Sequence, residues 1–185
     1  MHNDSTIKLE ESEIPVVDQY KFLGVIFDKK LTFIPHIKYL KNKCTRAQQL
    51  LRVVAHTEWG TDQQTLLKLY RSLIRSQLDY ACFVYRSARR SYLKELNSVH
   101  HEGLRQVIWA FRTSPADSLY VEAYEAPLQL RCEKLALQYY TKLKSCPSNP
   151  AYDCTFNQGY KECFEKKRKI NKTFWSPNGT HPQRI

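Results

Sequence analysis

The stretch that decides the fold is residues 35–54, PHIKYLKNKCTRAQQLLRVV. Its apolar residues recur at the i, i+3, i+7 spacing that gathers side chains on one face of an α-helix. That face would be formed by Ile37, Leu40, Cys44, Ala47, Leu51 and Val54. Pro35 suits the first turn of such a helix, where its missing N–H loses no hydrogen bond. The stretch therefore predicts a long helix with one buried face.

Helical periodicity continues downstream of this stretch. Thr61 or Asp62 can cap a second helix, because both side chains accept hydrogen bonds from free backbone N–H groups. Its apolar face would consist of Leu66, Leu69, Tyr70, Leu73 and Ile74. Residues 78–86, LDYACFVYR, either finish this helix or form a buried connector. Further helices are predicted over residues 90–109, 116–124 and 128–144.

Upstream of residue 35 the pattern changes from helix to strand. Short strands are predicted over residues 7–9, 14–17 and 20–27. Pro15 restricts the second strand to a sheet edge or to its own start, because proline cannot donate a backbone hydrogen bond. Gly24, inside the third, indicates either a bulge or a close approach of another backbone.

The C-terminal part has a different amino-acid composition. Residues 146–153, CPSNPAYD, contain two prolines and are predicted to be an extended loop. The last ten residues, SPNGTHPQRI, are typical of disorder. The predicted fold is mainly α, with a small N-terminal β-hairpin packed on a bundle of four to five helices and a disordered C-terminal tail. Its parts would be a β element (1–33), a helical bundle (34–145) and a loop-rich basic tail (146–185).

The charge of the chain is strongly positive, with 29 basic and 18 acidic residues and a net charge of +11. Residues 1–19 hold one lysine against five acidic residues, so the positive charge lies in the remainder. A basic surface attracts polyanions such as nucleic acids. Lys68, Arg71 and Arg75 share one helical stripe, and a charged stripe of this kind is either a binding surface or simply a solvated face.

The localisation that the sequence predicts is intracellular, either nuclear or cytoplasmic, and not secreted. The N-terminus lacks the basic start and apolar run of a signal peptide, and no stretch of roughly 20 apolar residues could span a membrane. The run Lys166-Lys167-Arg168-Lys169 is either a nuclear signal or a solvated tail. The six cysteines form no C-x-x-C pair and are predicted to be reduced thiols.

Catalytic and metal-binding residues are not predicted. Enzymes that join nucleotides hold two metal ions with paired carboxylates, but no two of the seven aspartates are adjacent. His100 and His101 are adjacent, but neighbouring helical residues point about 100° apart. We therefore expect one of these histidines to be buried and the other exposed, without a metal. No cofactor is predicted.

Several segments together resemble a known family. Residues 20–28, YKFLGVIFD, followed by Leu31-Thr32-Phe33 and Pro35-His36-Ile37, resemble the Y-L-G-V-x-x-D-x-x-L-T-W-x-x-H-I segment of jockey-like non-LTR retrotransposon reverse transcriptases. The resemblance continues through residues 69–80, 93–105, 111–115 and 127–131, and it covers residues 7–156. Each motif is weak alone, whereas their order and spacing together are specific.

The resemblance implies a position within such a polymerase. In the family, the L-G-V element follows the metal-binding Asp-Asp hairpin of the palm and forms the primer grip, and the helices that follow form the thumb. The implied primer-grip residues are Tyr20, Lys21, Phe22, Leu23 and Gly24. Together with the charge pattern, the resemblance points to phosphate contacts by Lys38, Lys41, Lys68, Arg71, Arg75 and Arg105. Mg²⁺ would be needed only by the palm.

The expected function is that of a reverse-transcriptase fragment which lacks the catalytic palm and is inactive by itself. It would bind the backbone of RNA or DNA without sequence preference. No Asp-Asp hairpin precedes Ile7, and Phe33 stands where the family usually has tryptophan. The alternative is a host-recruited or fossil helical module that binds an acidic protein partner and has no enzymatic role.

Overall fold

The computed structural model describes residues 7–9, 12–56 and 60–156. Of these, the residues up to 136 belong to one compact unit and residues 137–156 to a second. The chain is mainly helical with β-hairpins at its N-terminal end, so the predicted fold class is confirmed. The predicted disordered tail and the basic run at 166–169 lie outside the described residues. Within the described part, none of the helices is both long enough and apolar enough to cross a membrane.

Two antiparallel hairpins precede the helices. In the first, β1 (Ile7–Leu9) pairs with β2 (Ser12–Ile14), which ends just before Pro15 rather than at residue 17. In the second, β3 (Gln19–Phe22) pairs with β4 (Val25–Asp28). The prediction of one strand over residues 20–27 was therefore wrong.

The second hairpin turns at Leu23 and Gly24. Their φ angles are 45° and 83°, so both lie in the left-handed region. A two-residue turn of this kind matches the twist of the two strands, and its positive φ angles are easily adopted by glycine. Gly24 is therefore a turn residue and does not form a bulge within a strand.

Helix α1 (Ile34–Val54) matches the predicted long helix. Pro35 lies in its first turn, and the predicted buried face is confirmed except for Val54, the last residue, which is 37% exposed. The residue before the helix, Phe33, offers no side-chain cap. Asp28 instead orders the residues just before the helix, because its carboxylate accepts hydrogen bonds from the backbone N–H groups of Thr32 (3.0 Å) and Phe33 (2.8 Å).

The second helical segment is divided into short pieces, α2 (Gln63–Tyr70), the π-helical turn η1 (Arg71–Arg75), α3 (Ser76–Asp79) and α4 (Cys82–Tyr85). Asp62 caps α2 by accepting a hydrogen bond from the Thr65 backbone N–H at 3.1 Å. The segment is interrupted at Ala81, whose φ angle is 53°. Residues 78–86 thus both finish a helix and form a connector.

The remaining helices are α5 (Arg90–Val107), α6 (Ala116–Glu122), α7 (Leu128–Lys144) and α8 (Pro150–Phe156). The first three lie close to their predicted ranges. Helix α8 corrects the predicted loop over residues 146–153: proline is tolerated in a first helical turn, and the Asn149 side chain accepts a hydrogen bond from the Ala151 N–H at 2.9 Å.

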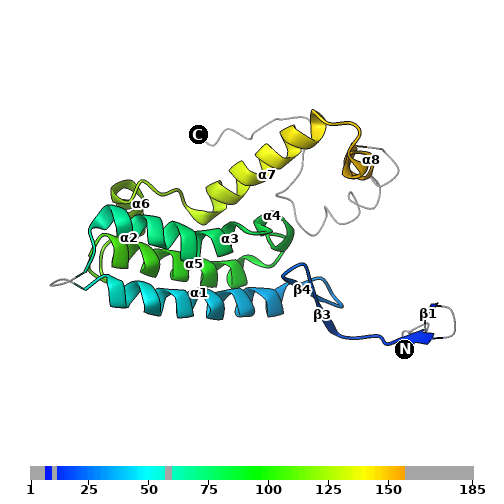
Figure 1. Ribbon diagram of the computed structural model, residues 1–185, viewed down its shortest axis with the longest axis horizontal. Coiled ribbons are helices and arrows are strands. Elements are labelled where there is room, and N and C mark those ends of the chain that lie inside the picture. Colours follow the sequence, from blue (N-terminus) through cyan, green and yellow to red (C-terminus); the bar gives the residue numbers. More distant parts are fainter. Residues whose placement is uncertain (1–6, 10–11, 57–59, 157–185) are drawn as a thin grey trace. The chain divides into compact units, whose positions relative to one another are not determined.

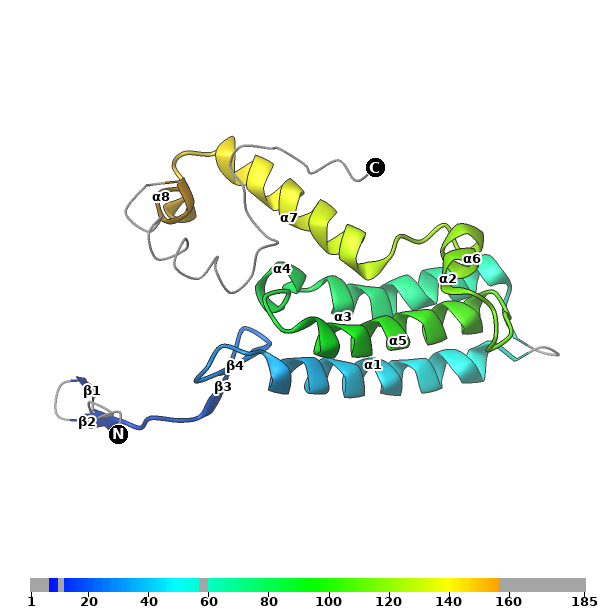
Figure 2. The same ribbon diagram turned by 180° about the vertical axis from the view of Figure 1, so that it is seen from behind.

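The core of the first unit lies between α1, α5 and the α2–α3 segment, which run side by side (Figures 1 and 2). Gly103 of α5 allows close packing, because a Cβ there would lie 2.7 Å from Cε2 of Tyr70. His100 is fully buried and bonded to the Tyr70 hydroxyl, and burial together with the charge of Arg75 lowers its pKa to about 3. The prediction that one of the adjacent histidines is buried is thus confirmed, whereas His101 is half-buried and not exposed as predicted.

Candidate nucleic-acid interface

The β3–β4 hairpin is held against the helices by its turn. The Tyr80 hydroxyl donates a hydrogen bond to the Leu23 carbonyl oxygen at 2.6 Å. A Cβ at position 24 would lie 3.4 Å from Cε1 of the same tyrosine, so the ring packs on the turn. Val25 is buried at the start of β4. The predicted primer-grip residues therefore all belong to one hairpin, which adjoins the start of α1 (Figure 1).

Strand β3 leaves its side chains accessible. All four of its residues are exposed, Tyr20 at 64% and Phe22 at 57%. Exposed aromatic rings close together in the chain are candidates for binding, since burying them is favourable. Aromatic rings beside cations are the arrangement on which nucleic-acid bases stack. These two rings are therefore available for stacking.

Lys21 connects the hairpin to helix α1. Its ammonium group lies 3.2 Å from the Tyr39 hydroxyl oxygen and 4.7 Å from the centre of the Tyr39 ring. Lys43 and Arg46 follow Tyr39 at i+4 and i+7, so they lie on the same stripe of the helix. We call these four residues, Lys21, Tyr39, Lys43 and Arg46, the hairpin–α1 strip.

The electrostatic field along the strip is positive. The pKa of Tyr39 is lowered, first by the hydrogen bond from Lys21 and then by the charges of Lys21, Lys43 and Arg46. Helix α1 contains no acidic residue that would offset this charge from within. Lys43 and Arg46 are exposed, and neither makes an ion pair within the described ranges. The strip can therefore accept anionic groups.

His36 lies beneath the strip and fixes its geometry. Its Nδ1 accepts a hydrogen bond from the Ile26 N–H of β4 at 3.4 Å, and its ring stacks on Tyr39 with centroids 6.5 Å apart. Burial, followed by the nearby charge of Lys21, lowers its pKa. In its neutral form, His36 can accept the hydrogen bond from the backbone N–H of Ile26 in β4 through Nδ1.

The other predicted cations are distributed over several surfaces. Lys38 and Lys68 are exposed and have no ion-pair partner in the described part of the chain. Lys41 pairs with Glu95 at 3.0 Å, and Arg71 pairs with Glu125 at 2.6 Å. Such half-exposed pairs are weak, so these two cations can exchange partners.

Arg105 has a different environment from the strip. It donates a hydrogen bond to the Ser114 carbonyl oxygen at 3.1 Å. It is half-buried on α5 beside the loop that leads to α6. Arg105 therefore does not belong to the hairpin–α1 strip.

Arg75 is buried and does not lie on the exposed stripe that was predicted for it. Only 5% of it is exposed, and its guanidinium pairs with Glu125 at 2.9 Å and with Asp79 at 3.4 Å. The π-helical turn η1 widens the helix at this point, which breaks the simple stripe expected for Lys68, Arg71 and Arg75. Arg75 instead holds the segment after α6 against α3.

The strip contains three residues that were absent from the predicted site, Tyr39, Lys43 and Arg46. Their i, i+4, i+7 spacing could be seen in the sequence. Their link to Lys21 could not, because it depends on how the hairpin folds back on α1. Within the described ranges, no group of three or more histidine, cysteine, aspartate or glutamate side chains is arranged to hold a metal ion.

The chain is similar in sequence to polymerases of retrotransposons. The chain is 28% identical over 140 residues, 72% of its length, to the RNA-directed DNA polymerase from mobile element jockey of Drosophila funebris. It is 33% identical over 104 residues, 51% of its length, to that of Drosophila melanogaster. It is 27% identical over 133 residues, 71% of its length, to the Pol polyprotein from type-1 retrotransposable element R1 of Bradysia coprophila.

These matches confirm the resemblance to jockey-like non-LTR retrotransposon reverse transcriptases. The chain spans only 14%, 11% and 13% of these three relatives, in the order given, so it corresponds to a limited part of them. No family model matches the chain, and no solved structure matches it significantly.

Proposed function

We propose that this chain acts as the part of a non-LTR retrotransposon reverse transcriptase that binds the backbone of RNA or DNA. The hairpin–α1 strip is the observation that carries the proposal. It brings three cations, Lys21, Lys43 and Arg46, close to the Tyr39 ring, and Tyr20 and Phe22 are exposed on the same strand as Lys21. Phosphates would contact the cations, and unpaired bases would stack on Tyr20 and Phe22.

Binding of this kind has no sequence preference. Contacts from lysine and arginine to phosphates position a protein on a nucleic acid but do not read the bases. Stacking is equally tolerant, because every base has a flat face. One relative is an RNA-directed DNA polymerase, which is consistent with a surface that binds nucleic acid.

The hairpin would act as the primer grip. The residues of its turn, Leu23 and Gly24, are held by Tyr80, while β3 stays exposed at its side. A grip of this design presents a fixed backbone edge to a nucleic-acid strand. We propose that nucleotide joining itself needs Mg²⁺ ligands outside this chain, because its acidic residues are scattered along the sequence.

The test is a filter-binding titration of an oligonucleotide over a range of salt concentrations. We expect the logarithm of the binding constant to fall linearly with the logarithm of the salt concentration. The double variant Lys43→Gln/Arg46→Gln should reduce the slope by roughly 1.4–1.8, since each lost phosphate contact on single- or double-stranded nucleic acid contributes roughly 0.7–0.9. Arg90→Gln, an exposed cation on α5, is the control and should leave the slope unchanged.

Two outcomes would contradict the proposal. One is negligible binding at low salt. The other is a double variant that binds as the wild type does. A third outcome would change the ligand. If a protein stays bound after nuclease treatment but does not bind the double variant, the strip binds an acidic protein instead of nucleic acid.

A further inference from the structure

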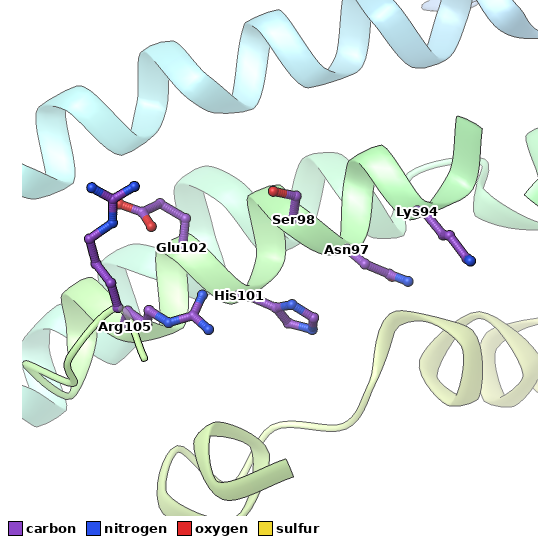
Figure 3. A pocket seen from close by; sticks show the side chains of 7 residues that line it. Lys94, Asn97, Ser98, His101, Glu102 and Arg105 are labelled. Atoms are coloured by element: carbon purple, nitrogen blue, oxygen red, sulfur yellow. The ribbon is translucent and has the colours of Figure 1, made fainter. Parts of the chain in front are cut away.

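A second cationic site lies along α5. A hollow of about 500 Å³ is lined there by Lys94, Asn97, Ser98, His101, Glu102, Arg105 and Arg112 (Figure 3). We call it the α5 pocket. Its volume falls within the roughly 300–1,000 Å³ of pockets that hold small ligands, but every side chain that lines it is polar. A polar ligand is therefore expected.

The charge of the α5 pocket is positive. Lys94, Arg105 and Arg112 face a single carboxylate, that of Glu102. This carboxylate already accepts a hydrogen bond from Arg52 at 3.3 Å. The pocket thus holds more positive charge than its own acid can balance, and it favours an anion.

Arg105 provides a donor that the protein itself does not use. One of its terminal nitrogens donates to the Ser114 carbonyl oxygen, which holds the side chain in place. Its buried Nε–H has no acceptor within the part of the chain that the structure describes. A buried donor without a partner is costly, and an anion's oxygen would supply the acceptor.

His101 is the charge-sensitive group of the pocket. It is half-buried and shares a hydrogen bond of 2.5 Å between its Nε2 and the Tyr120 hydroxyl. Burial and then the charge of Arg105 lower its pKa, and Asp117 acts in the opposite direction. An anion bound near Arg105 would add to the effect of Asp117 and would therefore raise this pKa.

We infer that the α5 pocket binds a phosphate group. The planar guanidinium groups of Arg105 and Arg112 suit the oxygens of phosphate, which they can contact in pairs, and Lys94 adds a point charge. The inference does not rest on the hairpin–α1 strip, because the two sites share no residue. Two sources offer such a phosphate, the phosphodiesters of a nucleic-acid backbone and the end of a strand.

The test follows the imidazole NMR signal of His101 during a titration with inorganic phosphate. His101→Asn identifies the signal. We expect a saturable shift together with a rise in the pKa of His101, whereas sodium chloride at the same ionic strength should not produce it. Lys94→Gln and Arg112→Gln change exposed side chains and should each weaken binding roughly tenfold, the effect expected for a lost charged hydrogen bond. Arg90→Gln should have no effect.

Two DNA strands of the same sequence, with a 5′-phosphate or a 5′-hydroxyl, distinguish the sources of the phosphate. If both strands compete equally with inorganic phosphate, the pocket binds backbone phosphodiesters. If only the phosphorylated strand competes, the pocket binds the phosphate at a strand end. A phosphate response equal to that of sodium chloride, or unchanged in both variants, would overturn the inference. If the chain binds the oligonucleotide but the His101 signal does not shift with phosphate, only the inference about the α5 pocket is refuted. If phosphate shifts the signal but the oligonucleotide does not bind, only the proposed function is refuted.

Discussion

At the scale of single residues, Asp28 couples the hairpin to the first helix. It is the last residue of β4, and its carboxylate accepts three hydrogen bonds, from the backbone and hydroxyl of Thr32 and from the backbone of Phe33. These bonds satisfy backbone donors just before α1, where Leu31 and Phe33 both have positive φ angles. One side chain thus orders the whole connection between strand and helix.

We predict that Asp28→Ala lowers the free energy of unfolding by about 1–3 kcal/mol, the usual loss when hydrogen bonds to a charged group are removed. Burial alone would raise the pKa of Asp28, but the hydrogen bonds from Thr32 and Phe33 outweigh it and lower the pKa. The contribution is therefore present above the unfolded pKa of about 3.9 and is lost as the pH falls through the lower, folded value.

Urea denaturation of Asp28→Ala at pH 7 and at pH 3 would measure this effect. The difference between wild type and variant should be smaller at the lower pH. Asp18→Ala, at an exposed position near the start of β3, is the control. Equal losses of stability in the two variants at pH 7 would show that the hydrogen bonds of Asp28 do not stabilise the connection to α1.

At the scale of elements, the position of the hairpin depends on Tyr80. The tyrosine lies after α3, and its hydroxyl bonds to the hairpin turn across 57 residues of chain. The predicted grip is therefore supported by the helices rather than by its own two strands. An isolated two-stranded hairpin would be only marginally stable.

We predict that Tyr80→Phe loosens the hairpin without unfolding the helices. Removing the hydroxyl deletes the bond to the Leu23 carbonyl, a loss of about 0.5–1.5 kcal/mol. Backbone amides of residues 22–27 should exchange with deuterium faster, while those of α5 should not change. Tyr124→Phe, at a position that is 90% exposed, is the matched control. Unchanged exchange in the hairpin would exclude this role for Tyr80.

The elements also show what could be predicted from the sequence. The buried face of α1 and the cap at Asp62 depend on residues close together in the chain, and both were found. The turn at Leu23 was missed because its φ angle of 45° is unusual for leucine, and a run of apolar residues without a polar turn signal favours one long strand. Helix α8 was missed because Pro150 could begin a helix or prevent one.

The candidate site was predicted only in part, for a related reason. The hairpin residues were found through the resemblance to retrotransposon polymerases, and their exposure agrees with a binding role. The burial of Arg75 could not be foreseen, because Glu125 lies 50 residues away and one π-helical turn changes which side the arginine faces. Periodicity describes regular helices only, and pairings between distant charges leave no local pattern.

At the scale of the first compact unit, a charge network connects segments far apart in the chain. Glu125 lies just after α6 and binds Arg71 and Arg75, while Asp79 binds Arg75 and Arg131 of α7. Arg75 also donates to the Ala126 carbonyl oxygen at 3.3 Å. The network thus holds the connection between α6 and α7 against η1 and α3, and its buried centre is Arg75.

The two arginines that share Glu125 differ in burial, and this difference makes a sharp prediction for the first compact unit. Arg75→Gln should lower the free energy of unfolding by roughly 3 kcal/mol, because it removes the buried charge between Glu125 and Asp79 and leaves them only the more exposed Arg71 and Arg131. Arg71→Gln should lower it by no more than about 1 kcal/mol, since that side chain is 48% exposed and water screens the pair. Urea denaturation of both variants gives the comparison. Similar losses for the two would mean that Glu125 and Asp79 are solvated in the folded protein, and the α6–α7 connection would then have to be held by apolar packing around Leu119 and Ala123 instead.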